Sequence, residues 1–92
     1  MERTTKRSDE NKKELITRLN RIEGQINGIK KMIETDKYCD DVLIQLSAVN
    51  NSIKSLANCL LESHLKTCVV REIKNGNYKI TDEVLNLIKR FQ

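Results

Sequence analysis

The sequence predicts an all-α protomer with two long helices and a short C-terminal helix, two copies of which form an antiparallel four-helix-bundle dimer. Two apolar stripes with alternating steps of four and three residues predict the long helices. The chain has no proline, and no segment shows the two-residue alternation of a strand. A single hairpin would leave much of both stripes exposed, so we expect a second copy to complete the core. The 92 residues form one domain, with residues 1–10 expected to be flexible.

The first helix is predicted from a sustained apolar stripe. Gly24 and Gly28 lie on one face of it, where another backbone could approach closely, although each weakens the helix by about 1 kcal/mol relative to alanine. The stripe consists of Leu15, Leu19, Ile22, Ile26, Ile29 and Ile33.

The second helix is predicted to run from about Asp40 to Ile73, a segment without Gly or Pro. Residues 35–37 form a short connector before it, and Asp36 or Asp40 is expected to cap it. Residues 75–77, Asn-Gly-Asn, are expected to end it with a left-handed turn. Its stripe consists of Val42, Leu46, Val49, Ile53, Leu56 and Leu60.

A short last helix follows. Thr81 is expected to cap it, with Asp82 and Glu83 at its positive end and Lys89 and Arg90 at its negative end. Its apolar face contains Val84, Leu85, Leu87, Ile88 and Phe91.

The charge favours a polyanionic partner. The net charge is +4 and the pI is about 9.1, and residues 1–37 hold ten Lys and Arg against seven Asp and Glu. No apolar run approaches the roughly 18 residues of a membrane span, and the polar N-terminus does not resemble a signal peptide. We therefore expect a cytoplasmic protein without a membrane partner, in which the thiols stay reduced.

Cys39, His64 and Cys68 form a candidate metal site. His64 and Cys68 are four residues apart, so both side chains can reach one ion from the same helix. Cys39 lies 25 residues before His64, or about 37 Å along a continuous helix. One protomer cannot gather all three, whereas an antiparallel second copy can, which gives two identical sites per dimer.

Two thiolates and one imidazole form a soft, three-coordinate set that suits Cu(I). Zinc would require a fourth ligand. Cys59 lies about half a helical turn away from Cys68 and is expected to be a small buried or boundary residue. A cysteine and a histidine could also suggest catalysis, but no Gly-rich turn or evident oxyanion donors accompany them, so we predict no catalytic residue and no enzyme. A helical oligomerisation module that senses nothing remains the alternative of another class.

Three stretches resemble the CsoR/RcnR family of bacterial metal-sensing and stress-sensing repressors. They are residues 18–25 (RLNRIEGQ), residues 38–46 (YCDDVLIQL) and residues 62–68 (ESHLKTC), and the resemblance extends over residues 14–92. It implies a dimer of dimers, that is a homotetramer, which binds double-stranded operator DNA and releases it when the inducer binds. Copper sensors of the family carry Cys, His and Cys at the positions of Cys39, His64 and Cys68, which implies Cu(I) as the inducer.

Other branches of the family fit less well. Nickel and cobalt sensors have histidine at the position of Cys68 and another near the N-terminus, whereas His64 is the only histidine here. Formaldehyde sensors use an N-terminal proline. Persulfide sensors keep the two cysteines but lack the histidine, so a persulfide-responsive repressor that uses Cys39 and Cys68 remains the alternative.

The resemblance also implies residues beside the metal ligands. Copper sensors of the family carry a tyrosine, matched by Tyr38, and a glutamate. The glutamate should fall at Val84, and Glu83 stands one position earlier. Glu83 is therefore the candidate for this role.

The operator is expected to contact basic residues, which would make binding strongly dependent on salt. Relatives often have Arg or Lys at positions occupied here by Ser47 and Asn50, so Lys54 is a possible substitute. The predicted DNA-binding residues are Arg18 and Arg21, supported by Lys12, Lys13, Lys30, Lys31 and Lys54.

Overall fold

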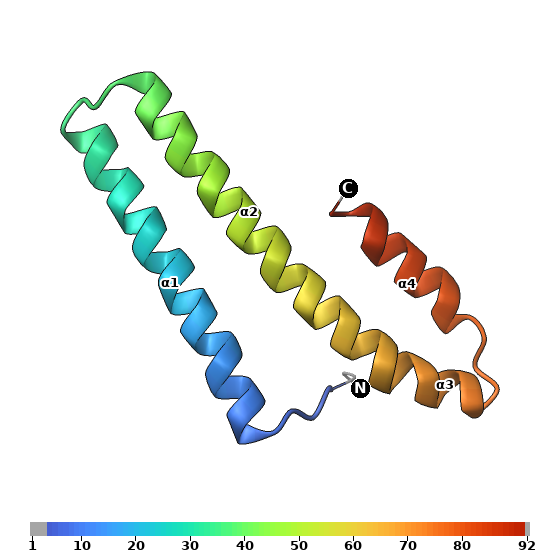
Figure 1. The fold of residues 1–92 in the computed structure, drawn as a ribbon. Helices are drawn as coiled ribbons and strands as arrows, with labels where there is room; N and C mark the ends of the chain where they lie inside the picture. Colours follow the sequence, from blue (N-terminus) through green and yellow to red (C-terminus); the bar gives the residue numbers. More distant parts are fainter. Residues whose placement is uncertain (1–3, 92) are drawn as a thin grey trace. The chain divides into compact units, whose positions relative to one another are not determined.

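The computed structural model describes residues 4–91, which are helical apart from their connections and contain no strand (Figure 1). Residue contacts divide the chain into two compact units, with the boundary between Leu56 and Ala57. Among the described residues, no helix combines the length and apolarity that a membrane span requires. The elements in order are α1 (Asp9–Glu34), α2 (Cys39–His64), the π-helical η1 (Leu65–Val69), α3 (Val70–Lys74) and α4 (Ile80–Lys89).

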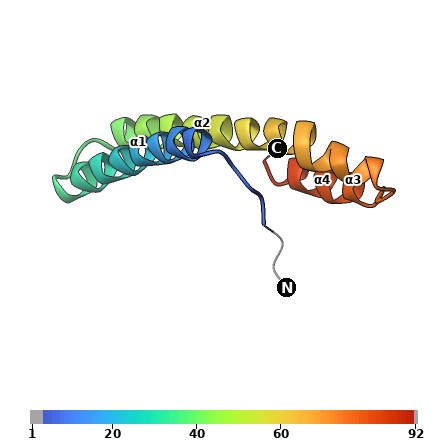
Figure 2. The same ribbon diagram turned by 90° about the horizontal axis from the view of Figure 1, so that it is seen from below.

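In the first unit, α1 and the first part of α2 lie side by side in opposite directions (Figures 1 and 2). α1 begins at Asp9 because the Ser8 side chain accepts a hydrogen bond of 3.1 Å from the Asn11 backbone N–H, and Asp9 and Glu10 lie at the positive end of the helix. The segment predicted to be flexible, residues 1–10, overlaps the first two residues of α1, and its flexibility stays a prediction. Residues 1–3, to which that prediction also applies, lie outside the described residues.

The connection between α1 and α2 is a left-handed helix end. Asp36 has a φ of 55°. Its N–H donates to the Ile33 carbonyl at 3.2 Å, and the Lys37 N–H donates to the Met32 carbonyl at 2.9 Å. This is a Schellman motif with aspartate where glycine is usual. Asp36 thus closes α1, and Asp40 lies inside the first turn of α2. The predicted role of either residue as the cap of α2 was wrong.

Each apolar stripe splits into two rows with seven-residue spacing. Ile22 and Ile29 of α1 and Val49 and Leu56 of α2 are 6–8% exposed and form the rows inside the hairpin. Of the alternate residues, Leu60 is half-buried and the other five are 42–62% exposed. A single chain therefore buries only about half of each stripe. We call the residues that stay uncovered the exposed rows. They are Leu19, Ile26 and Ile33 on α1, and Leu46 and Ile53 on α2.

The second unit contains the end of α2, η1, α3 and α4. The predicted helix to Ile73 continues to Lys74 through α2, η1 and α3, and its hydrogen bonding is π-helical from Leu65 to Val69. No Gly or Pro marks this change of hydrogen bonding in the sequence. It coincides with a tertiary contact, because Val69 packs in a core cluster with Ile80 and Val84.

The turn before α4 contains the predicted left-handed stop. Gly76 has a φ of 85°, and its N–H donates to the Ile73 carbonyl at 3.0 Å. α4 begins at Ile80, so the predicted cap at Thr81 was wrong: its hydroxyl lies inside the helix and donates to the Tyr78 carbonyl at 2.8 Å. Asp82 and Glu83 in the first turn and Lys89 in the last agree with the prediction.

Candidate metal centre and nucleic-acid interface

The three predicted metal ligands lie at two separate places. Cys39 is the first residue of α2 and is exposed, and His64 is its last residue and is half-buried. Cys68 lies in η1, and its thiol is free and half-buried. The 26 residues of α2 put Cys39 and His64 about 37 Å apart along the helix.

Within residues 4–91 of a single chain, no group of three or more His, Cys, Asp or Glu side chains could hold a metal ion. His64 and Cys68 lie near each other in sequence on either side of a π turn, and Cys39 is remote along the helix. The assignment of Cys39, His64 and Cys68 as ligands therefore depends on a second chain and remains a prediction.

Cys39 and His64 lie on the face of α2 that carries the exposed row. Cys39 precedes Leu46 by seven residues, and Leu46 precedes Ile53 by seven. His64 follows the half-buried Leu60 by four. Residues at these spacings share one face of a helix. The two candidate ligands at the ends of α2 thus face the same direction as its uncovered apolar side chains.

The surroundings of His64 and Cys68 leave both available as ligands. The half-buried imidazole of His64 makes no hydrogen bond within residues 4–91. The Thr67 hydroxyl lies 3.7 Å from the Cys68 sulfur and 2.8 Å from the Ser63 carbonyl. The π turn that separates the two ligands is of a kind that often occurs at functional sites.

One ion pair links α2 to η1 beside these ligands. The Lys66 ammonium donates to a Glu62 carboxylate oxygen at 2.9 Å. This hydrogen bond and the positive charge lower the pKa of Glu62. Both side chains are largely exposed, so the pair adds little stability.

The residues expected beside the ligands have different environments. Tyr38 is 69% exposed, and its carbonyl begins α2 by accepting the N–H groups of Asp41 and Val42. Glu83 is half-buried in the first turn of α4. Val84, where the family resemblance predicts a glutamate, is a core residue with 5% exposure. The roles of Tyr38 and Glu83 therefore remain predictions.

Cys59 is exposed. The prediction that it is a buried or boundary residue was wrong for the single chain. It lies on α2 outside the row of Cys39 and Leu46, because 20 residues separate it from Cys39 and 20 steps of 100° give a rotation of about 200°.

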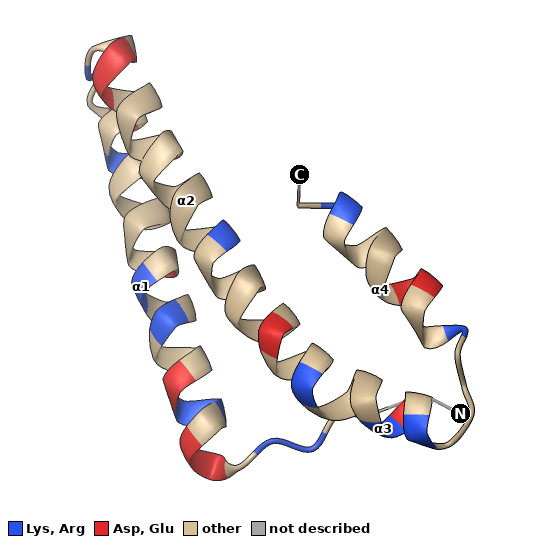
Figure 3. Cartoon of the chain, turned by 45° about the vertical axis from the view of Figure 1, so that its right-hand side comes forward, with Lys and Arg blue, Asp and Glu red and all other residues tan. Residues whose placement is uncertain are grey.

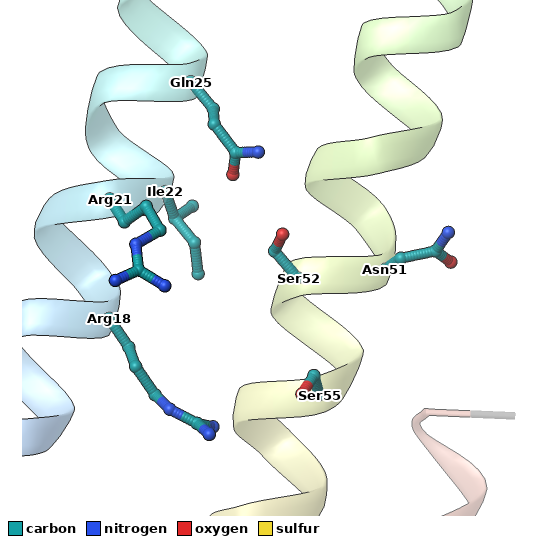
Figure 4. Close-up of a pocket in the computed structure, with 7 residues that line it drawn as sticks. All are labelled: Arg18, Arg21, Ile22, Gln25, Asn51, Ser52 and Ser55. Atoms are coloured by element: carbon teal, nitrogen blue, oxygen red, sulfur yellow. The ribbon is translucent and has the colours of Figure 1, made fainter.

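A polar hollow of about 330 Å³ lies between α1 and α2 in the first unit. In Figure 4, the Arg18 guanidinium reaches toward Ser55 of α2, and the Gln25 amide also points toward α2. Arg18 is half-buried and Arg21 is exposed. The arrangement joins two cationic side chains with hydroxyl groups, a combination that suits phosphate oxygens. The lining residues are Arg18, Arg21, Ile22, Gln25, Asn51, Ser52 and Ser55.

The polar lining was not identified from the sequence. The Gln25 side-chain oxygen is buried and has no hydrogen-bond partner among the described residues. The Ser52 hydroxyl donates to the Ala48 carbonyl at 3.1 Å. Single polar residues outside an apolar stripe look like solvated helix surface, so only the arginines gave a signal.

A second hollow extends along α1 and has both acidic and basic side chains in its lining, which consists of Glu10, Lys13, Glu14, Thr17, Arg18 and Arg21. Figure 3 shows the charged residues distributed along α1, whereas the middle of α2 carries few. The structure thus brings together three of the predicted DNA-binding residues. The other four are exposed and line neither hollow: Lys12, Lys30, Lys31 and Lys54.

Comparison with known proteins shows one family throughout. The family model described as metal-sensitive transcriptional repressor matches residues 11–90. The copper-sensing transcriptional repressor CsoR of Bacillus subtilis (strain 168) is 43% identical over 86 residues, which cover 92% of this chain and 85% of that protein. The copper-sensing transcriptional repressor RicR of Mycobacterium tuberculosis (strain ATCC 25618 / H37Rv) is 54% identical over 59 residues, 64% of this chain and 62% of that protein.

Solved structures share the fold. The copper-sensing repressor CsoR with Cu(I) from Geobacillus thermodenitrificans NG80-2 has a TM-score of 0.89 and 36% identity, covering 96% of this chain and 93% of that one. The nickel-responsive transcriptional regulator InrS has a TM-score of 0.74 and 32% identity, covering 99% of this chain and 100% of that one. These similarities confirm the predicted fold class of the protomer.

Proposed function

Because the chain belongs to the family of metal-sensitive transcriptional repressors, we propose that it represses transcription in the cytoplasm by binding operator DNA and releases the operator when it binds Cu(I). The ion would be held between two chains, by Cys39 of one and by His64 and Cys68 of the other. The observation that carries this proposal is the position of Cys39 and His64 on the face of α2 that also holds Leu46 and Ile53.

The exposed row is compatible with an antiparallel dimer in the following register. If Ile53 of one chain lies opposite Ile53 of the other, residues equally far from it on either side are paired. Leu46, seven residues before Ile53, then faces Leu60, seven residues after it. This register covers Leu46 and Ile53, which are 46% and 42% exposed in the single chain, and it is compatible with a two-fold axis.

The same register brings the candidate ligands together. Cys39 lies fourteen residues before Ile53, and Thr67 lies fourteen after it. Cys39 of one chain would therefore approach the segment between His64 and Cys68 of the other. A single register therefore covers the apolar row and also brings the candidate ligands together.

The donors in this set fit Cu(I). Two thiolates and one imidazole form a soft, three-coordinate site, and neither Cys39 nor Cys68 forms a disulfide. Bound there, Cu(I) would join two chains through a single coordination sphere. A set with only three protein donors is less suitable for zinc, which prefers four.

The DNA interface is proposed to lie on the side of α1 that carries Arg18 and Arg21. Arg18 and Arg21 border both hollows, and Ser55 of α2 lies across from Arg18 (Figure 4). These groups would bind phosphates of the duplex backbone. Such contacts fix the position of the protein on the DNA but do not recognise the base sequence. The four remaining lysines would add to the positive field around it.

Repression and induction follow from linkage. The metal site would join two chains at the ends of α2, and the DNA surface depends on how the chains are arranged. If the DNA-bound arrangement holds the ligands poorly, then metal and DNA weaken each other's binding by the same factor, typically 5-fold to 150-fold.

An anaerobic titration of the operator complex tests the proposed function. Cu(I), Zn(II), Ni(II) and a persulfide donor are added in parallel, and release is followed by fluorescence anisotropy of labelled DNA. We expect release at about one Cu(I) per chain, and native mass spectrometry should find that ratio in an oligomer of two or four chains. Release by the persulfide donor alone, without Cu(I) binding, would contradict the copper proposal and favour a sensor that uses Cys39 and Cys68.

Arg21→Ala should weaken operator binding and lower its salt dependence. Each lost phosphate contact reduces the slope of log K against log salt by about one. Lys79→Ala is the matched control, because Lys79 is an exposed cation outside both hollows. The slopes are measured by fluorescence anisotropy at salt concentrations between about 50 and 200 mM. Equal slopes for the two variants would place the DNA interface elsewhere.

A further inference from the structure

The most deeply buried cluster in the described chain holds the segment that carries Cys68. Val69, Ile80 and Val84 are 3–5% exposed, and Ile73 and Ile88 pack against them. The buried residues of the hairpin in the first unit are 6–8% exposed. The most deeply buried side chains in residues 4–91 therefore lie where α4 contacts the end of the long helical segment.

Val69 connects this cluster to η1. It is the one buried residue of the five in η1, since Leu65, Lys66 and Thr67 are exposed and Cys68 is half-buried. Val69 directly follows Cys68 in the chain. α4 thus contacts the π turn through a side chain one residue away from the candidate ligand.

We propose that Ile80 and Val84 of α4 are positioning residues for Cys68, which they hold in place through Val69. This inference rests on the proposed function. A shift of η1 on α4 would change the distance between the Cys68 thiol and the His64 imidazole, because the π turn lies between them. The packing of α4 and the affinity for Cu(I) are therefore linked, so that each strengthens the other.

The inference also explains why Val84 suits this chain. Its side chain is 5% exposed and packs with Val69 and Ile80. A glutamate there would bury a carboxylate in an apolar cluster, which is unfavourable without a partner.

The first test uses the metal-free protein and amide hydrogen exchange in residues 65–69. Val84→Ala should speed exchange there by about tenfold, since loss of packing raises the population of locally open states. Val49→Ala is the matched control, because Val49 is 7% exposed in the first unit and loses the same two methyl groups. Val49→Ala should leave the relative protection of residues 65–69 unchanged.

The second test measures Cu(I) affinity by competition with a chromophoric chelator under anaerobic conditions. Val84→Ala should bind Cu(I) about tenfold more weakly, and Val49→Ala less than about threefold more weakly, in line with typical effects of mutations on coupling. Val84→Ile, which keeps a branched apolar side chain, should restore most of the affinity. Ile80→Val provides a milder change if Val84→Ala fails to fold, and should weaken binding by about threefold.

The outcomes separate this inference from the proposed function. If the unmodified protein binds Cu(I) and the variants at Val84 and Val49 lose affinity equally, or not at all, the positioning role is wrong while the proposed function stands. If the unmodified protein binds no Cu(I), the proposed function fails. Unchanged exchange in residues 65–69 of metal-free Val84→Ala would also overturn the positioning role.

Discussion

Two variants that each fail to bind Cu(I) tightly, Cys39→Ala and Cys68→Ala, should recover binding when their chains are mixed. Each variant alone removes one thiolate from every shared site, and we expect affinity to fall by more than about a hundredfold, beyond the loss usual for residues that only support a ligand. In a mixed dimer, the intact Cys39 of one chain meets the intact His64 and Cys68 of the other. One of the two sites is then complete.

The expected stoichiometry is specific. Random pairing of equal amounts makes about half of the dimers mixed, each with one complete site, so the mixture should bind about one quarter of a Cu(I) ion per chain with the original affinity. The chains are unfolded and refolded together under reducing conditions, and bound Cu(I) is counted by native mass spectrometry. Cys59→Ala, an exposed thiol outside the proposed set, should bind normally by itself. A mixture that binds no more than its two components would show that the site does not span two chains.

The helices were largely predictable because their signals are local. Six apolar residues at steps of four and three define one face of α1 whatever the helix packs against. The helix ends were less predictable. Thr81 is a good capping residue by type, yet α4 begins one residue earlier and its hydroxyl donates to the Tyr78 carbonyl. Asp36 looked like a cap for α2 but instead takes the left-handed position that closes α1.

Other features depend on contacts between segments and left no mark in the sequence. Leu19 and Ile22 are equally apolar, and only the packed hairpin shows that Ile22 is buried and Leu19 is exposed. The π turn in η1 contains no unusual residue and coincides with the packing of Val69 in the cluster with α4.

The candidate site was predictable to the extent that residue type reveals chemistry. The residue types of two cysteines and the single histidine predict a soft set of metal ligands, and their spacing shows that one straight helix cannot bring them together. Gln25 and Ser55 gave no such signal, because a polar residue in a helical hollow has the same sequence pattern as one in solvent. Their place beside Arg18 became evident only from the hairpin.

Ile53→Asp should convert the protein to monomers and abolish tight Cu(I) binding although all three candidate ligands remain. In the proposed register, Ile53 of each chain faces its equivalent at the two-fold axis, so the substitution would bury two carboxylates against each other. Desolvation costs several kcal/mol for each buried ion, which predicts at least a hundredfold weaker association. Sedimentation equilibrium measures the assembly, and chelator competition measures the copper affinity.

Ile44→Asp is the matched control, because Ile44 is also an exposed isoleucine on α2, at 63%, but lies outside the row of Leu46 and Ile53. It stands nine residues before Ile53, which places it about half a helical turn away. We expect it to keep both assembly and copper affinity. The comparison separates a general effect of charge on α2 from an effect on the shared face. If Ile53→Asp still assembled and bound Cu(I) like the control, the ligands would have to meet without the apolar register, and the argument that joins core and metal site would fail.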